Sequence, residues 1–175
     1  MAQTRSLVVI LGDQLNRDAS AFDDFDVKQD AVWMAEVDEE STHIWSSKQR
    51  IALFISAMRH FAQALRKEKI NLHYSELGDP NNTQSIEGEL ARTIALCNPS
   101  RLMMTAPGDW RVLEKIKQLA LQTGIELEIR EDRYFFSTVR EFFEHAKGRK
   151  QLRLEYWYRE LRKKHRVLMD GDSPA

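Results

Sequence analysis

The chain has 175 residues, of which 42% are hydrophobic and 30% charged, and its formal net charge is −1. This length and composition fit one globular domain with a substantial core and argue against a long disordered segment. The single cysteine, Cys97, excludes an intrachain disulfide framework and suits a reducing compartment. No secretory leader opens the chain and no apolar stretch approaches the ~18 residues of a membrane helix, so we expect a cytoplasmic protein without membrane contact.

The small net charge hides an uneven distribution. Residues 1–44 carry ten acidic side chains against three basic ones, a net of −7, whereas residues 147–166 carry nine basic against two acidic ones, a net of +7. An acidic head and a basic tail suggest that the two ends meet different partners. Equally, both can be solvated faces that partly attract each other.

The stretch Leu7–Leu15 (LVVILGDQL) begins with a short apolar run, which is typical of a strand buried on both faces of a parallel sheet. Ligands of open α/β sheets bind where the carboxyl ends of the strands meet the loops, so Gly12, Asp13 and Gln14 stand where a site is expected. Alternatively, Asp13 only caps a following helix. The polar residues 16–29 predict a loop or one short helix.

Strand and helix patterns then alternate along the chain. The next apolar run, Ala31–Val37, predicts a second strand, and a polar cluster follows it to Ser47. Further strands are expected at Ile70–Leu77, Arg101–Thr105 and Ile125–Arg130, and helices at Lys48–Lys69, from Ile86 to Cys97, and from Trp110 to a stop at Gly124. Five such alternations predict an α/β fold with a doubly wound, Rossmann-like, five-stranded parallel sheet.

The longest predicted helix has an apolar face and a candidate cap. Ser46 or Ser47 can cap its N-terminus. Its apolar residues recur at helical spacing: Ile51, Phe54, Ile55, Met58, Ala62 and Leu65.

After Asp132 the pattern changes, so we place the α/β domain at residues 1–132 and a helical linker segment at residues 133–175. A helix is expected at Ser137–Lys147, with Phe142 and Phe143 on its inner side. The last residues predict no closing element, and the chain is expected to stop inside a longer protein.

A second helix is expected at Leu152–His165, and no strand follows to cover its apolar stripe of Leu154, Trp157, Tyr158 and Leu161. The basic residues around it, interleaved with aromatic ones, can hold phosphates and stack on bases. The other interpretation is a docking helix with a solvated basic side.

The turn after the first strand reads GDQL and lacks both GxGxxG and GxxxxGK[ST]. A phosphate cradle of glycine amides is therefore absent, and Asp13 would repel a phosphate. A neutral or hydrogen-bond-donating ring system is the better ligand for this edge, because a carboxylate can accept hydrogen bonds from it.

Carboxylates gather after the second strand, at Glu36, Glu39 and Glu40. Paired carboxylates can act as acid and base or bind Mg²⁺, and the alternative is a solvated acidic loop, which suits Glu39. Glu36 and Glu40 are the better candidates to face a ligand. His43 is a further candidate because it follows Glu40 by three residues. No GxSxG elbow or metal-spaced histidine pair is present.

Four segments carry a family resemblance: LGDQL, KQRIALFISAMRHFAQAL, TAPGDWR and GRKQLRLEYWYRELRKKHRVLMDG. Together they resemble, in register from Leu7 to Gly171, the N-terminal region of photolyase-related proteins, the iron–sulfur bacterial cryptochromes and prokaryotic (6-4) photolyases. The resemblance implies an antenna domain that holds 6,7-dimethyl-8-ribityllumazine.

In the family, a helical domain follows that binds FAD and a four-iron cluster and repairs ultraviolet-damaged DNA or signals blue light. The resemblance therefore implies this FAD-binding helical domain as a partner, and damaged DNA through it. The cluster needs four cysteines and this chain has one, so FAD and the cluster are expected in an absent C-terminal part. The chain alone is then expected to be inactive as a lyase.

The resemblance also carries over individual residues. Asp13 and Glu40 match acidic positions of the lumazine pocket, Lys48 and Ile51 match the start of the adjacent helix, and Gly108-Asp109-Trp110 matches a loop that reads PGEW in relatives. With the candidates from the sheet edge, the expected cofactor-binding residues are Gly12, Asp13, Gln14, Glu36, Glu40, His43, Lys48, Ile51, Phe54, Gly108 and Asp109. No catalytic or metal-binding residue is expected.

Three places depart from the family pattern. Relatives often have tyrosine at His43, two histidines at Ser46-Ser47, and a smaller aliphatic residue at Phe54. A larger ring at Phe54 narrows the pocket. A second interpretation therefore stays open, in which the domain is a structural module with an empty pocket that docks on a helical FAD domain or another partner.

Overall fold

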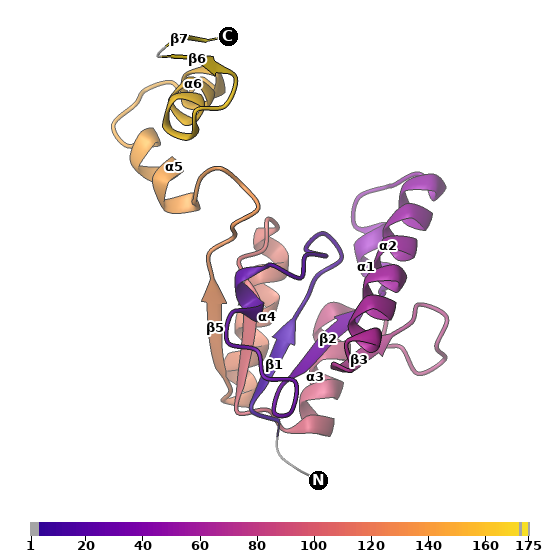
Figure 1. Cartoon of the computed structure of the whole chain (residues 1–175). Coiled ribbons are helices and arrows are strands. Elements are labelled where there is room, and N and C mark those ends of the chain that lie inside the picture. Colours follow the sequence, from indigo (N-terminus) through magenta and orange to yellow (C-terminus); the bar gives the residue numbers. More distant parts are fainter. Residues whose placement is uncertain (1–3, 172, 175) are drawn as a thin grey trace. The chain divides into compact units, whose positions relative to one another are not determined.

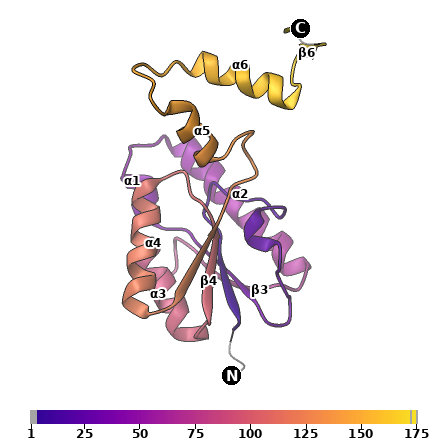
Figure 2. The same cartoon turned by 90° about the vertical axis from the view of Figure 1, so that its left-hand side faces the viewer.

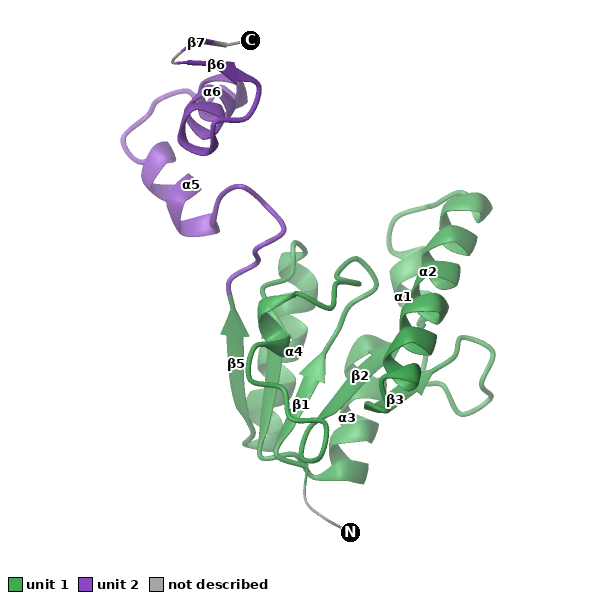
Figure 3. Ribbon diagram, viewed as in Figure 1, with its two compact units in different colours: residues 1–130 green, residues 131–175 purple. Residues whose placement is uncertain are grey.

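The computed structural model describes residues 4–171 and 173–174, and the chain forms two compact units, residues 1–130 and 131–175 (Figure 3). The first unit contains β1 (Ser6–Val9), a 3-10 turn η1 (Ser20–Phe22), β2 (Ala31–Ala35), α1 (Asp38–Thr42), α2 (Lys48–Lys67), β3 (Asn71–Ser75), α3 (Ile86–Cys97), β4 (Arg101–Thr105), α4 (Trp110–Thr123) and β5 (Glu126–Arg130). The second contains α5 (Val139–Ala146), α6 (Leu154–His165), β6 (Met169–Asp170) and β7 (Ser173–Pro174).

The five strands of the first unit form one parallel sheet in the order β3-β2-β1-β4-β5, which confirms the predicted doubly wound α/β fold (Figure 1). From β1 the chain builds outward through β2 to β3 and then returns to place β4 on the other side of β1. The direction of growth therefore reverses beside β1, and η1 after β1 and α4 after β4 pack on opposite faces of the sheet. Such a switch point is where open α/β sheets hold ligands.

Both faces of the sheet are covered. Strand β1 alternates, sending Leu7 and Val9 into one apolar cluster and Val8 into the other. The first cluster includes residues of α3 and α4, and the second includes residues of α2 and η1, so helices lie on opposite sides of the sheet (Figure 2). A sheet buried on both faces explains why its central strands read as continuous apolar runs.

Local capping chemistry sets the ends of the helices. The Ser47 side chain accepts a hydrogen bond from the Arg50 amide at the start of α2, and Asp109 caps α4 in the same way. Gly124 ends α4 with φ of 68°, in the left-handed region that glycine adopts without a steric penalty.

Replacing Gly124 with alanine should therefore destabilise the domain by about 1 kcal/mol, because a Cβ is strained at this positive φ. Urea unfolding followed by circular dichroism measures the change. Gly78→Ala is the control, because a Cβ there meets no atom within 4 Å and its φ is not positive. An equal loss of stability in both variants would contradict this role of Gly124.

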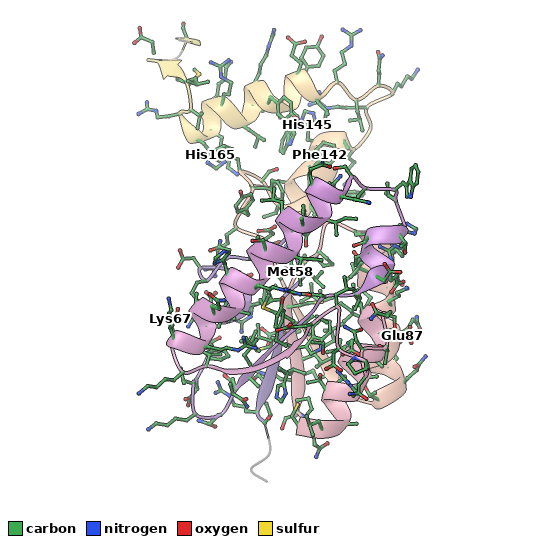
Figure 4. All side chains as sticks on the ribbon, turned by 90° about the vertical axis from the view of Figure 1, so that its right-hand side faces the viewer. Met58, Lys67, Glu87, Phe142, His145 and His165 are labelled. Atoms are coloured by element: carbon green, nitrogen blue, oxygen red, sulfur yellow. The ribbon has the colours of Figure 1, made fainter. Side chains whose placement is uncertain are left out.

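Some local predictions need correction. The polar stretch before Ser47 contains the short helix α1, and β2 ends at Ala35 rather than at Val37. In α2 the predicted apolar stripe is buried only in its second half, at Met58, Ala62 and Leu65, whereas Phe54 is 40% exposed. Met58 lies on the side of α2 that faces the sheet (Figure 4). The first half of α2 extends past the sheet edge and has no strand beneath it (Figure 1).

The second unit has an aromatic core of its own. The His145 ring is buried between α5 and α6, where Nδ1 lies 2.8 Å from the Glu160 carboxylate and the ring centroid lies 4.7 Å from that of Trp157. Phe142 lies beside His145 on α5 (Figure 4). The prediction that Phe143 faces inward is wrong, since this side chain is exposed.

The prediction of no closing element is also wrong. Strands β6 and β7 pair antiparallel, with Met169 opposite Pro174 and Asp170 opposite Ser173. Two-residue strands carry almost no hydrophobic pattern, so a hairpin of this size leaves little signal in a sequence.

Candidate functional site

A pocket of about 270 Å³ opens at the carboxyl edge of the sheet in the first unit. The strand arrows in Figure 1 point to this edge, and the pocket is lined by residues that follow β1, β2 and β4 and by the first half of α2. It therefore lies at the switch point of the sheet. Its volume is close to the lower end of small-molecule sites, roughly 300–1,000 Å³.

The interior of the pocket is apolar. Gly12 forms part of the wall, and a Cβ on this residue would lie 3.0 Å from the Met58 sulfur, so glycine leaves room where the loop after β1 approaches Met58 of α2. The other apolar lining residues are Ile10, Leu11, Trp33, Ala35, Val37, Ile51, Phe54, Ile55, Met58, Leu77, Ile86, Pro107 and Val112. A wall of this kind suits a flat aromatic ring system.

Trp33 is one of the residues of this wall and carries a buried polar atom. The residue is 1% exposed, and its indole Nε1–H has no hydrogen-bond partner among the residues that the structure describes. An unsatisfied buried donor costs roughly 1–3 kcal/mol, whereas a carbonyl or ring nitrogen of a bound heterocycle can accept its hydrogen bond. This buried donor therefore belongs to a residue of the pocket lining.

Carboxylates dominate the polar part of the lining. Asp13 follows β1, Glu40 lies on α1 and Asp109 precedes α4, and we call these three residues the acidic rim. Among the described lining residues the one cation is Arg50, whose guanidinium lies over the Phe54 ring at 5.6 Å from its centroid. Carboxylates accept hydrogen bonds from hydroxyl groups and disfavour an anionic ligand.

Arg111 ties the loops of the acidic rim together. Its Nη2 donates to Glu40 Oε1 at 2.8 Å and to Asp109 Oδ2 at 3.2 Å, and its Nη1 donates to Glu39 Oε1 at 3.4 Å. Glu39 also pairs with Lys115. The Arg111 guanidinium therefore holds carboxylates from two sides of the pocket mouth in place.

The charge of Asp109 is maintained by its hydrogen bonds. Partial burial alone would raise the pKa of Asp109, but the backbone amides of Arg111 and Val112 and the nearby Arg111 guanidinium outweigh it and lower the pKa. The residue is therefore an anion at neutral pH.

Glu36 is buried at the base of the pocket, and its carboxylate accepts hydrogen bonds from other groups of the chain. Arg59 donates from Nε to Oε1 at 2.7 Å and from Nη2 to Oε2 at 2.8 Å, the Leu77 amide donates to Oε2 at 2.9 Å, and the Tyr74 hydroxyl donates to Oε1. Burial alone would raise the pKa of Glu36, but these hydrogen bonds outweigh it and hold the pKa below its ordinary value. Burial and the Glu36 charge raise the pKa of Tyr74.

The structure brings most of the expected site residues together. Those that line the pocket are Gly12, Asp13, Glu36, Glu40, Ile51, Phe54 and Asp109. The other four lie outside the lining. The Gln14 amide donates to the Thr105 and Ala106 carbonyls, His43 is exposed at the end of α1, and Lys48 and Gly108 are exposed.

Sequence reasoning missed three residues of the site: Trp33, Arg50 and Arg111. In the sequence, Trp33 appears only as part of an apolar strand, because the neighbouring residues do not indicate that its N–H lacks a hydrogen-bond partner. Arg111 pairs with Glu40, which lies 71 residues away in the chain. The segment GDWR places Arg111 next to the predicted loop, and this neighbourhood was the one available signal.

Within residues 4–171 and 173–174, no group of three or more histidine, cysteine, aspartate or glutamate side chains is arranged to hold a metal ion. In the same part of the chain, no helix is both long and apolar enough to cross a membrane.

Comparison with known proteins shows the family of the chain. Residues 8–175 match the family described as deoxyribodipyrimidine photo-lyase-related protein, and the chain therefore belongs to the photolyase-related family. It is 44% identical over 169 residues to a protein of Agrobacterium fabrum (strain C58 / ATCC 33970) named (6-4) photolyase. This alignment covers 97% of the chain and 33% of the relative, so the chain spans about a third of the length of that curated protein.

Proposed function

We propose that the pocket binds 6,7-dimethyl-8-ribityllumazine and that this domain is the light-harvesting antenna of a photolyase-related protein. The observation that carries the proposal is the pocket itself, an apolar slot at the switch point of the sheet whose polar lining consists mainly of carboxylate hydrogen-bond acceptors. A flat heterocycle fits such a slot, and its ribityl hydroxyls donate to the acidic rim.

An antenna domain needs to carry out little chemistry of its own. The bound chromophore would absorb light and pass the excitation on, and the efficiency of this transfer depends on its distance and orientation. The residues around the slot need only hold the ring rigidly and exclude water. The Arg111 contacts to Glu40 and Asp109 and the Glu36–Arg59 pair stiffen the rim and the base of the pocket.

The acceptor of the excitation would lie outside these residues. We propose that it is FAD, held together with a four-iron cluster in a helical domain that also binds damaged DNA or signals blue light. Four thiolates are needed for such a cluster and the chain has one cysteine, so its ligands must come from elsewhere. A cytoplasmic location suits both the DNA substrate and the free thiol of Cys97.

Titration of the purified protein with 6,7-dimethyl-8-ribityllumazine, followed by the ligand's fluorescence, tests the proposal. We expect saturable binding of one ligand per chain. We expect Asp13→Ala and Glu40→Ala each to weaken the affinity about tenfold, because each removes a hydrogen bond to a charged acceptor, worth roughly 1.5 kcal/mol.

The matched control is Glu39→Gln. Glu39 neighbours Glu40 but does not line the pocket, and its carboxylate pairs with Lys115 and Arg111. Its substitution should leave the affinity within about twofold of the parent. Protein that leaves the ligand's fluorescence unchanged at saturating concentration would contradict the proposal.

A second candidate function is favoured by one observation in the second unit. Large apolar side chains are exposed there, including Tyr134, Phe135, Phe136, Val139, Phe143, Leu152, Leu154, Tyr156 and Tyr158. Exposed apolar groups on this scale mark an interaction surface. A chain that binds no lumazine but retains this surface would be a structural module that docks on a helical domain.

A further inference from the structure

Among the residues that the structure describes, amides at the helix N-termini near the pocket mouth are already taken by acceptors of the protein itself. Phosphates at the switch points of α/β folds are held by free amides at helix N-termini. In α4, however, Asp109 Oδ1 accepts from the amides of Arg111 and Val112 at 2.8 and 3.4 Å. In α2 the Ser47 hydroxyl accepts from the Arg50 amide at 3.3 Å. The protein's own acceptors therefore occupy two of the first amides of α4 and one of α2.

The same holds for α1 and for the Arg111 guanidinium, whereas Arg50, the one cation among the described lining residues, lies over the Phe54 ring. The Asp38 amide donates to Gln84 Oε1 at 3.1 Å, and the Glu39 amide donates to the Gln84 carbonyl at 3.3 Å. Arg111, which could otherwise bind a phosphate with two parallel hydrogen bonds, directs its Nη atoms to Glu39, Glu40 and Asp109. The carboxylates of Glu40 and Asp109 are the groups that these loops contribute to the pocket lining.

We propose that Glu40, Asp109 and Arg111 form a specificity element that admits a ligand with a free hydroxyl tail and rejects the same ligand as a phosphate ester. A hydroxyl can donate to either carboxylate, whereas a phosphate dianion has no proton to donate and is repelled by both. Arg111 acts as a positioning residue, because it reaches the ligand only through the carboxylates that it holds. The inference rests on the proposed function, since it concerns the tail of the ligand bound in that pocket.

Binding of a matched pair of ligands tests the inference. The probes are 6,7-dimethyl-8-ribityllumazine and its 5′-phosphate ester, titrated into the full chain at low and high salt. The quantity measured is the ratio of their dissociation constants. The parent protein should bind the free ribityl ligand at least about tenfold more tightly, and the ratio should shrink in 1 M salt as the repulsion is screened.

Two substitutions should move this ratio in opposite directions. Asp109→Asn keeps a capping oxygen but removes a negative charge, so the ratio should fall about threefold or more. Arg111→Gln removes the cation that offsets the rim, so the ratio should rise. Glu126→Gln, at the opposite end of the sheet where β5 begins, is the control and should leave the ratio unchanged.

The outcomes separate the two proposals. If the parent chain binds the free ligand and its phosphate ester equally, the proposal of a specificity element is wrong, and the proposed function stands. Movement of the ratio in the same direction by Asp109→Asn and Arg111→Gln would also overturn it. A loss of fold cannot cause such movement, because it lowers both affinities together and leaves their ratio unchanged. If neither ligand binds the parent chain, the proposed function fails and the inference fails with it.

Discussion

Glu36→Gln is expected to lower the free energy of unfolding by about 2–3 kcal/mol at neutral pH, because it neutralises a buried carboxylate that accepts four hydrogen bonds. The amide that replaces the carboxylate keeps the shape of the side chain but can accept at one atom only. Arg59 then loses its bidentate partner, and a second donor, from Tyr74 or Leu77, is left without an acceptor. Urea unfolding at pH 7 measures the loss.

The effect of Glu36→Gln should depend on pH. The folded-state pKa of Glu36 lies below its ordinary value of 4.5, so in that range the unfolded chain binds more protons than the folded chain. The stability that Glu36 contributes is therefore complete above pH 4.5 and is lost as the pH falls through the folded-state pKa. The stability curves of the parent and variant should be well separated at pH 7 and should approach each other in acid.

Glu68→Gln is the control for this prediction. Glu68 pairs with Arg17 on the surface, with both side chains more than a third exposed, and such pairs are worth roughly 0–1 kcal/mol. A loss from Glu36→Gln that stays constant from pH 7 to pH 3, or one no larger than that of Glu68→Gln, would show that the ion pair at the base of the pocket is not a stabilising contact.

Gly12→Leu is expected to weaken lumazine binding about 100-fold, because the new side chain must either enter the pocket or push Met58 into it. The backbone tolerates the change, since Gly12 is not among the residues with positive φ. Met58 can also move the end of its flexible side chain, so the loss of stability should stay near 1 kcal/mol. Ligand fluorescence and urea unfolding, measured on the same preparation, separate the two effects.

Two further variants make this test specific. Gly78→Leu adds the same side chain where a Cβ meets no atom within 4 Å, and it should leave binding unchanged. Gly12→Leu combined with Met58→Ala removes the side chain that the leucine would meet, and it should recover part of the affinity. If Gly12→Leu binds lumazine as tightly as the parent protein, the ligand does not occupy this pocket.

The local pattern of the sequence determined the fold almost completely. Strands buried on both faces read as continuous apolar runs, and β4 falls at Arg101–Thr105, as predicted. Helix ends follow from single residues, as with Ser47 before α2 and Gly124 after α4. These signals are strong because the chemistry acts between residues that are neighbours in the chain. Family segments such as LGDQL and TAPGDWR led to the same fold and to family membership, which the comparisons confirm.

Tertiary structure decided which residues of the candidate site act together. Glu36 and Arg59 are 23 residues apart and Arg111 and Glu40 are 71 apart, so no local pattern pairs them. Helical spacing places Phe54 on the apolar stripe of α2, yet its exposure depends on whether the sheet extends beneath that turn. The missing partner of the Trp33 N–H is likewise a property of its surroundings. A sequence specifies such contacts only through the packed fold, because hydrogen bonds and burial are set by distances between segments remote in the chain.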